Sequence, residues 1–357
     1  MPDQKIDSPE TVLVLPFADG IGDFVNMQPL LYAIARRFPE ASISVAASTY
    51  ANYLVSPDFP VKIVTPSWFE KDPGPIAQRL RHLIPQKFLA FFAGPVLKRE
   101  LGGNIDLIIN TIYLWERHMD FPRYWTPQIP LRPGAKHTLD CLADVLEQEL
   151  DIVIPKAARF PKLYIRPTAT EWAADFIKTN NPEQRPLVAL VAESNMLIKK
   201  WPAGHWAYLS DCLQEKGYQT IFFAPENSEL NQRILTLTKH PPLVASTTLD
   251  NVAALMKECN LCIGVDTGLL HIAAAVDTEW LGLFGPTNPD VTGPYDQALG
   301  RGLVSPFPRG ESCRTCWKSF KYEDDKCLTL DIGSCIDHLD RRVVLEASLE
   351  MLEGAKV

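Results

Sequence analysis

Short apolar runs alternate with a stretch of helical spacing in the first part of the chain. The runs Val12–Phe17, 41–47 and Ile105–Ile112 are short and apolar enough to be buried strands. Between the first two of them, residues 24–38 carry leucine, isoleucine and phenylalanine at helical spacing. Strand, loop, helix and strand in this order predict a parallel, doubly wound sheet, with a tight loop at the carboxyl end of its first strand.

The second part of the chain repeats this alternation more regularly. Apolar runs that predict strands occur at residues 186–192, 219–224, 243, 260–265 and 279–284. Stretches that predict helices occur at residues 205–215, 229–237, 251–258 and 269–275. Asp250 is placed to cap the third of these helices. The sequence therefore predicts the α/β class for both parts of the chain.

The length of 357 residues suits two domains. The proline-rich stretch 155–186 interrupts both periodicities and predicts a linker. We expect an N-terminal domain over residues 11–165 and a C-terminal domain over residues 166–340, the latter with a cysteine-rich segment at 313–335. A C-terminal helix over residues 341–355 is expected to pack back on the first domain. Two such domains facing each other would surround one cleft with the loops at the carboxyl ends of their strands.

Charge and hydropathy exclude some classes of protein. A net charge of −8 opposes general nucleic-acid binding, which needs a surplus of Lys and Arg. The apolar stretch Phe88–Leu97 falls well short of the roughly 20 residues that span a bilayer, and the polar first ten residues do not fit a signal peptide. We expect a cytoplasmic protein. Residues 76–101 interleave basic and apolar side chains, which suits either contact with an anionic partner at the inner face of the membrane or a solvated helix face.

Two loops that follow predicted strands carry charged side chains. In residues 18–23, two glycines precede Asp23 at the start of a helix, although the glycines alone would equally suit a tight turn. The loop 193–202 holds Lys199 and Lys200 and ends in a tryptophan and a proline. A lysine held there would meet a phosphate as a point charge, whereas the alternative is a pair of solvated surface lysines.

Two further loops follow later strands of the second part. Asp266, Thr267, Gly268 and His271 lie between a predicted strand and a predicted helix, whose first amide groups would form a seat for a diphosphate. The alternative is that Asp266 caps the helix and His271 is a core histidine. Residues 285–295, rich in Gly and Pro, suit either the rim of a pocket or a plain tight turn.

Four cysteines form a compact set near the end of the chain: Cys313, Cys316, Cys327 and Cys335. Their number and the initial Cys-x-x-Cys spacing are typical of a tetrathiolate structural site for zinc or iron. The later spacings are irregular, so reduced thiols or a disulfide remain alternatives. The other cysteines, Cys141, Cys212, Cys259 and Cys262, are expected to be core residues.

Taken in order along the chain, these motifs resemble glycosyltransferase family 9, the family of bacterial heptosyltransferases, and the match covers nearly the whole chain. The resemblance implies the GT-B architecture, with two Rossmann-like domains facing across a cleft, the donor bound mostly by the second and the acceptor mostly by the first. It implies that Asp23 is the general base and that Lys199 and Asp266 act with it. The residues that would bind the donor are Gly22, Ser194, Glu226, Thr267, Gly268 and His271, with Glu226 on the nucleotide ribose.

The chain departs from the family pattern in two places. Leu270 stands where relatives often have a hydroxyl residue, and the hydroxyl residues usual before the loop lysine are represented only by Ser194. These departures leave the identity of the donor sugar more open than the reaction type.

The resemblance implies inverting transfer of a sugar, such as heptose from ADP-heptose, without a catalytic metal. The acceptor would be a hydroxyl of the lipopolysaccharide core or of another surface glycan, or a protein hydroxyl. Two other classes stay open: a noncatalytic nucleotide-binding protein of the same fold, and a nucleotide-sugar epimerase, which would turn over the donor alone.

Overall fold

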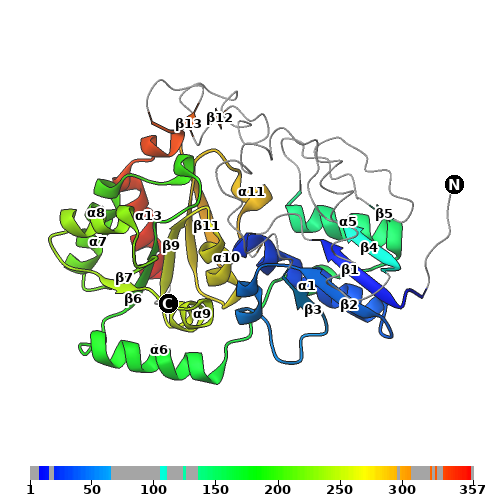
Figure 1. The fold of residues 1–357 in the computed structure, drawn as a ribbon. Helices are drawn as coiled ribbons and strands as arrows, with labels where there is room; N and C mark the ends of the chain where they lie inside the picture. The colour runs from blue at the N-terminus through cyan, green and yellow to red at the C-terminus, as the bar shows by residue number, and fades with distance from the viewer. Residues whose placement is uncertain are drawn as a thin grey trace. The chain divides into compact units, whose positions relative to one another are not determined.

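The chain forms two compact units in a computed structural model (Figure 1). Unit 1 comprises Met1–Pro130 and Leu139–Arg159, and unit 2 comprises Leu131–Thr138 and Phe160–Val357. The structure describes residues 8–15, 20–65, 105–110, 124–125, 136–295, 298–306, 322–323, 326–327 and 333–354. Within these ranges, no helix is long and apolar enough to cross a membrane. The basic stretch 76–101 lies outside them.

Unit 1 is built on a parallel sheet, five-stranded among the residues that the structure describes, in the order β3-β2-β1-β4-β5. The strands are β1 (Thr11–Leu15), β2 (Ser42–Ala46), β3 (Lys62–Val64), β4 (Leu107–Asn110) and β5 (Tyr124–Trp125). The chain reverses its direction of winding between β1 and β4, so the loops that follow these two strands flank the crevice of this sheet. This arrangement confirms the prediction of a doubly wound α/β unit.

The helical elements of unit 1 follow from its apolar pattern. They are α1 (Ile21–Arg37), α5 (Thr138–Leu150) and the 3-10 helices η1 (Thr49–Tyr53) and η2 (Lys156–Ala158). Leu30, Leu31 and Ile34 of α1 are fully buried, as their spacing predicts. At the opposite end of the sheet, the carboxylate of Asp106 accepts hydrogen bonds from the backbone N–H groups of Glu10 and Thr11, which ties the start of β4 to the start of β1.

Unit 2 contains a second parallel sheet, six-stranded within the described ranges, in the order β11-β10-β9-β6-β7-β8. Its strands are β6 (Leu187–Val191), β7 (Gln219–Phe223), β8 (Leu243–Ala245), β9 (Leu261–Val265), β10 (Trp280–Phe284) and β11 (Gly300–Val304). A short antiparallel pair, β12 (Tyr322–Glu323) and β13 (Lys326–Cys327), lies apart from this sheet. The winding reverses between β6 and β9, the two central neighbours (Figure 1).

Helices cover both faces of the second sheet. They are α6 (Pro167–Asn180), α7 (Ala203–Glu215), α8 (Glu229–Leu237), α9 (Leu249–Lys257), α10 (Gly268–Ala275), α11 (Pro289–Thr292) and α13 (Arg341–Gly354), with the 3-10 helices η3 (Leu197–Lys199) and η5 (Cys335–His338). Trp201, Trp206 and the apolar side of α13 share one core with Phe222 and Leu283 of the strands. All five positions of β6 are buried, which explains its continuous apolar sequence.

Two details differ from the sequence predictions. A helix, α6, occupies residues 167–180 of the stretch that predicts a linker, because Pro167 stands at its first turn, where proline needs no hydrogen-bond donor. Asp250 does not cap α9: the cap position is Thr248, and Asp250 lies in the first turn, 3.7 Å from Arg166. The C-terminal helix α13 packs on α7 and β9 within unit 2, where Val344 and Leu352 are buried.

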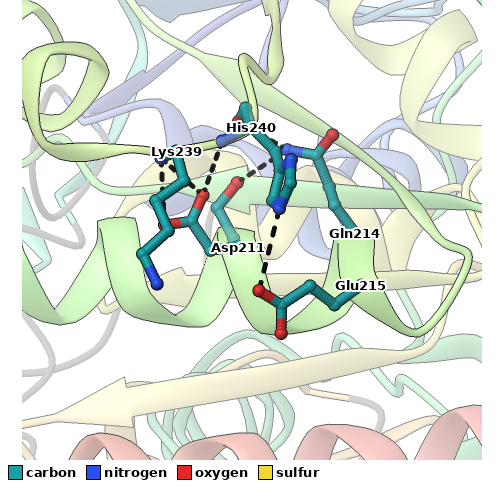
Figure 2. A network of polar contacts seen from close by, with 6 residues as sticks. Asp211, Gln214, Glu215, Lys239 and His240 are labelled. Carbon is teal, nitrogen blue, oxygen red and sulfur yellow. Dashed lines mark hydrogen bonds and ion pairs between the residues drawn. The ribbon is translucent and has the colours of Figure 1, made fainter.

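A polar network joins α7 to the segment between α8 and β8 (Figure 2). The carboxylate of Asp211, only 7% exposed, accepts hydrogen bonds from the backbone N–H groups of Lys239 at 2.9 Å and His240 at 3.0 Å. Gln214 donates to the carbonyl of His240 at 2.8 Å, and Glu215 lies 3.7 Å from its ring. These contacts satisfy the backbone groups that follow the last turn of α8.

We predict that Asp211→Ala lowers the free energy of unfolding by about 1–3 kcal/mol, because two backbone donors lose their buried acceptor. Urea denaturation of the full chain measures this loss. Lys239→Ala is the matched control, since Lys239 joins this network through its backbone N–H and the substitution keeps that group. Equal stability of Asp211→Ala and the wild type would show that water replaces the carboxylate without cost.

Candidate active site

The reversal of winding between β6 and β9 places two loops side by side at the carboxyl ends of these strands. The loop after β6 runs through η3 and carries Lys199, and the loop after β9 carries Asp266 and leads into α10. In open α/β sheets, this position is where ligands bind. Two of the loops predicted from the sequence therefore meet at the expected edge of the second sheet.

Lys199 and Asp266 form a largely buried ion pair across this position. Lys199 Nζ lies 2.8 Å from Asp266 Oδ2, and the two side chains are 13% and 7% exposed. Thr287, in the loop after β10, donates its hydroxyl hydrogen to the same carboxylate oxygen at 2.6 Å. One carboxylate therefore holds together loops that follow three different strands.

The electrostatics of this cluster follow from burial and from the cation. Burial raises the pKa of Asp266, but the Lys199 ammonium and the hydrogen bonds from Lys199 and Thr287 outweigh it and leave the pKa below its ordinary value. Burial lowers the pKa of His271 to about 4, although Asp266 opposes this shift. His271 is therefore neutral near pH 7. Its Nδ1 has no hydrogen-bond partner within the described part of the chain.

Helix α10 begins beside this carboxylate. Its cap residue, Thr267, has extended backbone and makes no side-chain capping bond, and Gly268 is the first helical residue. The first N–H groups of a helix lack partners within the helix and attract anions. Asp266 is thus an ion-pair partner and not the helix cap, whereas His271 is a buried residue of α10, as the alternative interpretation expects.

The remaining charged side chains of the β6 loop contact the next loop of the sheet. Lys200 Nζ lies 2.7 Å from Glu193 Oε2, and Ser228 at the start of α8 donates a short hydrogen bond to Glu193 Oε1. Ser194 Oγ accepts from the backbone N–H of Met196 at 3.2 Å. Glu226 is exposed in the turn that precedes α8. Ser194 and Glu226 are predicted site residues, whereas Glu193, Ser228 and Thr287 are not predicted from the sequence.

Asp23 lies in the first turn of α1 in unit 1, as the sequence predicts. Gly20 caps this helix with a φ of −74°, so neither it nor Gly22, inside the helix, is needed for a positive φ. The side chain of Asp23 instead folds back over Gly20, where an added Cβ would lie 2.5 Å from Asp23 Oδ2. A larger residue at position 20 would therefore displace the Asp23 carboxylate from this position.

The predicted metal ligands are only partly described. Cys313 and Cys316 lie outside the described residues, Cys327 is half-buried in β13 and Cys335 is buried in η5. Within the described ranges, no group of three His, Cys, Asp or Glu side chains is arranged to hold a metal. Both β13 and η5 lie against η3, the element that carries Lys199. Of the other cysteines, Cys259 and Cys262 are buried as expected, whereas Cys141 and Cys212 are half-buried.

Comparison with known proteins places these features in a family. The model of glycosyltransferase family 9 (heptosyltransferase) matches residues 131–309, half of the chain. The chain is 23% identical over 300 residues to lipopolysaccharide heptosyltransferase 2 of Escherichia coli, a match that covers 77% of this chain and 82% of that protein. A shorter match, 30% identical over 135 residues, is to lipopolysaccharide heptosyltransferase 1 of Pseudomonas aeruginosa and covers 37% of each chain, well under two thirds of that relative.

Solved structures share the fold over nearly the whole chain. A family 9 glycosyltransferase from Veillonella parvula superposes with a TM-score of 0.71 at 20% identity, over 97% of this chain and 98% of that one. The E. coli ADP-heptose lipopolysaccharide heptosyltransferase II gives 0.67 at 20% identity, over 97% and 100%. The iron-containing dodecameric glycosyltransferase TibC of enterotoxigenic E. coli gives 0.58 at 12% identity, over 99% and 78%. This chain therefore belongs to glycosyltransferase family 9 and is a glycosyltransferase of the GT-B fold.

Proposed function

We propose that this glycosyltransferase transfers heptose from ADP-heptose to a hydroxyl group of the lipopolysaccharide core, with inversion at the anomeric carbon and without a catalytic metal. The similarity to lipopolysaccharide heptosyltransferase 2 and to an ADP-heptose lipopolysaccharide heptosyltransferase supports this donor and this acceptor. The observation that carries the proposal is the buried Lys199–Asp266 pair at the position where the second sheet reverses its winding. A cation held there by a carboxylate suits the leaving diphosphate of a nucleotide sugar.

Unit 2 binds the donor in this proposal. Lys199 has three N–H donors, so it can keep its contact with Asp266 and still donate to phosphate oxygens. The backbone N–H groups at Thr267 and Gly268 add donors at the amino end of α10, and neutral His271 lies one turn further along this helix. Glu226 accepts hydrogen bonds from the ribose hydroxyls, and Ser194 contributes to the donor site of unit 2. Gly22, in unit 1, is the remaining residue proposed to bind the donor.

Asp23 of unit 1 is the proposed general base. The acceptor oxygen attacks the anomeric carbon while its proton passes to the Asp23 carboxylate, and the bond between that carbon and the phosphate oxygen breaks. The electron pair leaves with ADP, whose new charge is stabilised by Lys199 and the amides of α10. The first turn of α1 favours the ionised form of a carboxylate, which the base requires before the reaction.

Asp23→Asn should reduce turnover by roughly 100-fold to 10,000-fold, because the amide keeps the size of the side chain but cannot accept the proton. ADP affinity and melting temperature should hardly change. The measurement is release of ADP from ADP-heptose with a deacylated lipopolysaccharide core as acceptor. Asp58→Asn, which alters an exposed carboxylate of the same unit, is the control. Retention of more than about a third of wild-type turnover by Asp23→Asn would assign Asp23 to helix capping alone.

The four cysteines Cys313, Cys316, Cys327 and Cys335 are proposed to hold one structural zinc or iron. Elemental analysis of protein purified without chelator should give about one metal atom per chain. Cys335→Ser should lose this metal and lower the melting temperature more than it lowers the turnover of the folded fraction, because metal binding contributes to folding. Cys212→Ser, which changes a half-buried cysteine of α7, should keep the metal. Metal-free protein with four titratable thiols in this segment would contradict the proposal.

The neutral state of His271 predicts a pH dependence of stability. In the unfolded chain His271 gains a proton below its ordinary pKa of 6.5, whereas burial lowers the pKa in the folded chain to about 4. Acid therefore favours the unfolded state between these values. When the pH falls from 7 to 4.5, the free energy of unfolding should therefore decrease by about 2 kcal/mol less in His271→Gln than in the wild type. His240→Gln is the control, and parallel pH profiles of His271→Gln and the wild type would show that His271 is protonated normally in the fold.

A further inference from the structure

We propose that Glu193 is a positioning residue for donor binding: its carboxylate clamps the loop of Lys199 to the turn of Glu226 and thereby holds Glu226 where it meets the nucleotide ribose. The inference rests on the proposed function and deepens it. It concerns a side chain that follows β6 directly and that neither takes part in the transfer nor contacts the reacting atoms.

The clamp consists of one carboxylate between two donors. Glu193 Oε2 lies 2.7 Å from Lys200 Nζ, and Glu193 Oε1 accepts the hydroxyl hydrogen of Ser228. The side chains of Lys200 and Glu193 are 26% and 20% exposed, and Ser228 is buried. These are charge-assisted contacts at low exposure, which hold geometry better than a surface ion pair.

Ser228 connects Glu193 to the backbone turn that contains Glu226. Its hydroxyl oxygen accepts from the backbone N–H of Asn231 at 2.9 Å and so caps α8, and its own N–H donates to the carbonyl of Pro225 at 3.1 Å. The second bond closes a turn in which Glu226 is a central residue. The exposed side chain of Glu226 has no partner of its own within the described ranges, so its position depends on the backbone of this turn.

The carboxylate of Glu193 also gives the two neighbouring lysines different partners. Lys200 is neutralised by Glu193, whereas Lys199 is paired with Asp266 at the carboxyl end of β9. The clamp thus holds the loop of Lys199, the proposed phosphate-binding cation, and the turn of Glu226, the proposed ribose-binding acid, at a constant distance from each other.

The test compares two ligands that differ only in the ribose hydroxyls, ADP and 2′,3′-dideoxy-ADP. Calorimetry on the full chain should show that the wild type prefers ADP by about tenfold or more, since a pair of hydrogen bonds to a charged group is lost with the dideoxy compound. Glu226→Ala should abolish this preference. Glu193→Gln should reduce it to about twofold, because Lys200 and Ser228 donate to different carboxylate oxygens and the amide NH2 group that replaces one of them cannot accept a hydrogen bond. Lys200→Met should act in the same direction, and affinity for the dideoxy compound should stay within about twofold of the wild type in every variant.

Glu229→Gln is the matched control, because Glu229 is an exposed acid in the first turn of α8, three residues after Glu226. Equal weakening of both ligands in Glu193→Gln would mean that Glu193 only stabilises the fold, and a full wild-type preference in that variant would mean that it has no role. Either result overturns the clamp while the Glu226→Ala result still supports the donor site. Absence of any ADP preference in the wild type would overturn the ribose contact of Glu226, and the clamp with it.

Discussion

Burying the charges of Lys199 and Asp266 has a large desolvation free energy, and the need to compensate it explains the arrangement of the loops around this pair. Each charge loses its hydration, and only close geometry with further hydrogen bonds compensates this loss. The carboxylate has both, from Lys199 at 2.8 Å and from Thr287 at 2.6 Å. Removing one member of such a pair costs about 3–5 kcal/mol in other proteins, because the remaining charge stays buried. The loops after β6, β9 and β10 are therefore fixed relative to one another before any ligand arrives.

A fixed cation suits the departure of a diphosphate. A lysine on a free loop would have to lose side-chain and backbone entropy as charge develops on the leaving group, whereas Lys199 is already ordered by Asp266. The low pKa of Asp266 keeps the carboxylate ionised and so keeps its partner in place. His271, neutral and buried on the next helical turn, adds no charge that would compete with this pair.

A second layer of residues supports these loops from behind. Trp201, fully buried, ends the Lys199 loop and donates from Nε1 to the carbonyl of Leu339 at 3.0 Å, which ties the loop to the end of η5. Cys335 at the start of η5 packs against Gly285, where an added Cβ would lie 3.3 Å from the sulfur. Cys335 and the residue that follows η5 thus contact two of the loops of the candidate site.

Much of this fold was predictable because its signals are local. The apolar runs predicted β6, β7, β9 and β10 to within about two residues, since parallel strands buried on both faces are continuously apolar. The two compact units divide after Arg159, and Leu131–Thr138 belong to unit 2, while a functional domain boundary after Ile165 stays a prediction. The family motifs led to Lys199 and Asp266, but their bond joins residues 67 positions apart and follows from strand order. Glu193, Ser228 and Thr287 carried no signal, because a single Glu, Ser or Thr in a loop is common and its partner is set only by the register of the sheet.

Asp23 lies at the start of a helix, where a carboxylate usually has a structural role. A carboxylate in the first turn of a helix ordinarily stabilises the exposed N–H groups there, and asparagine would serve nearly as well. In α1 the cap position is a glycine without any side-chain capping bond, and the Asp23 carboxylate lies over that glycine, where an added Cβ would make the carboxylate shift. A helix selected for stability alone would place Ser, Thr or Asp at the cap instead. The helix thus forgoes a capping side chain while leaving room for a carboxylate at the carboxyl end of β1, the edge at which sheets of this class bind their ligands.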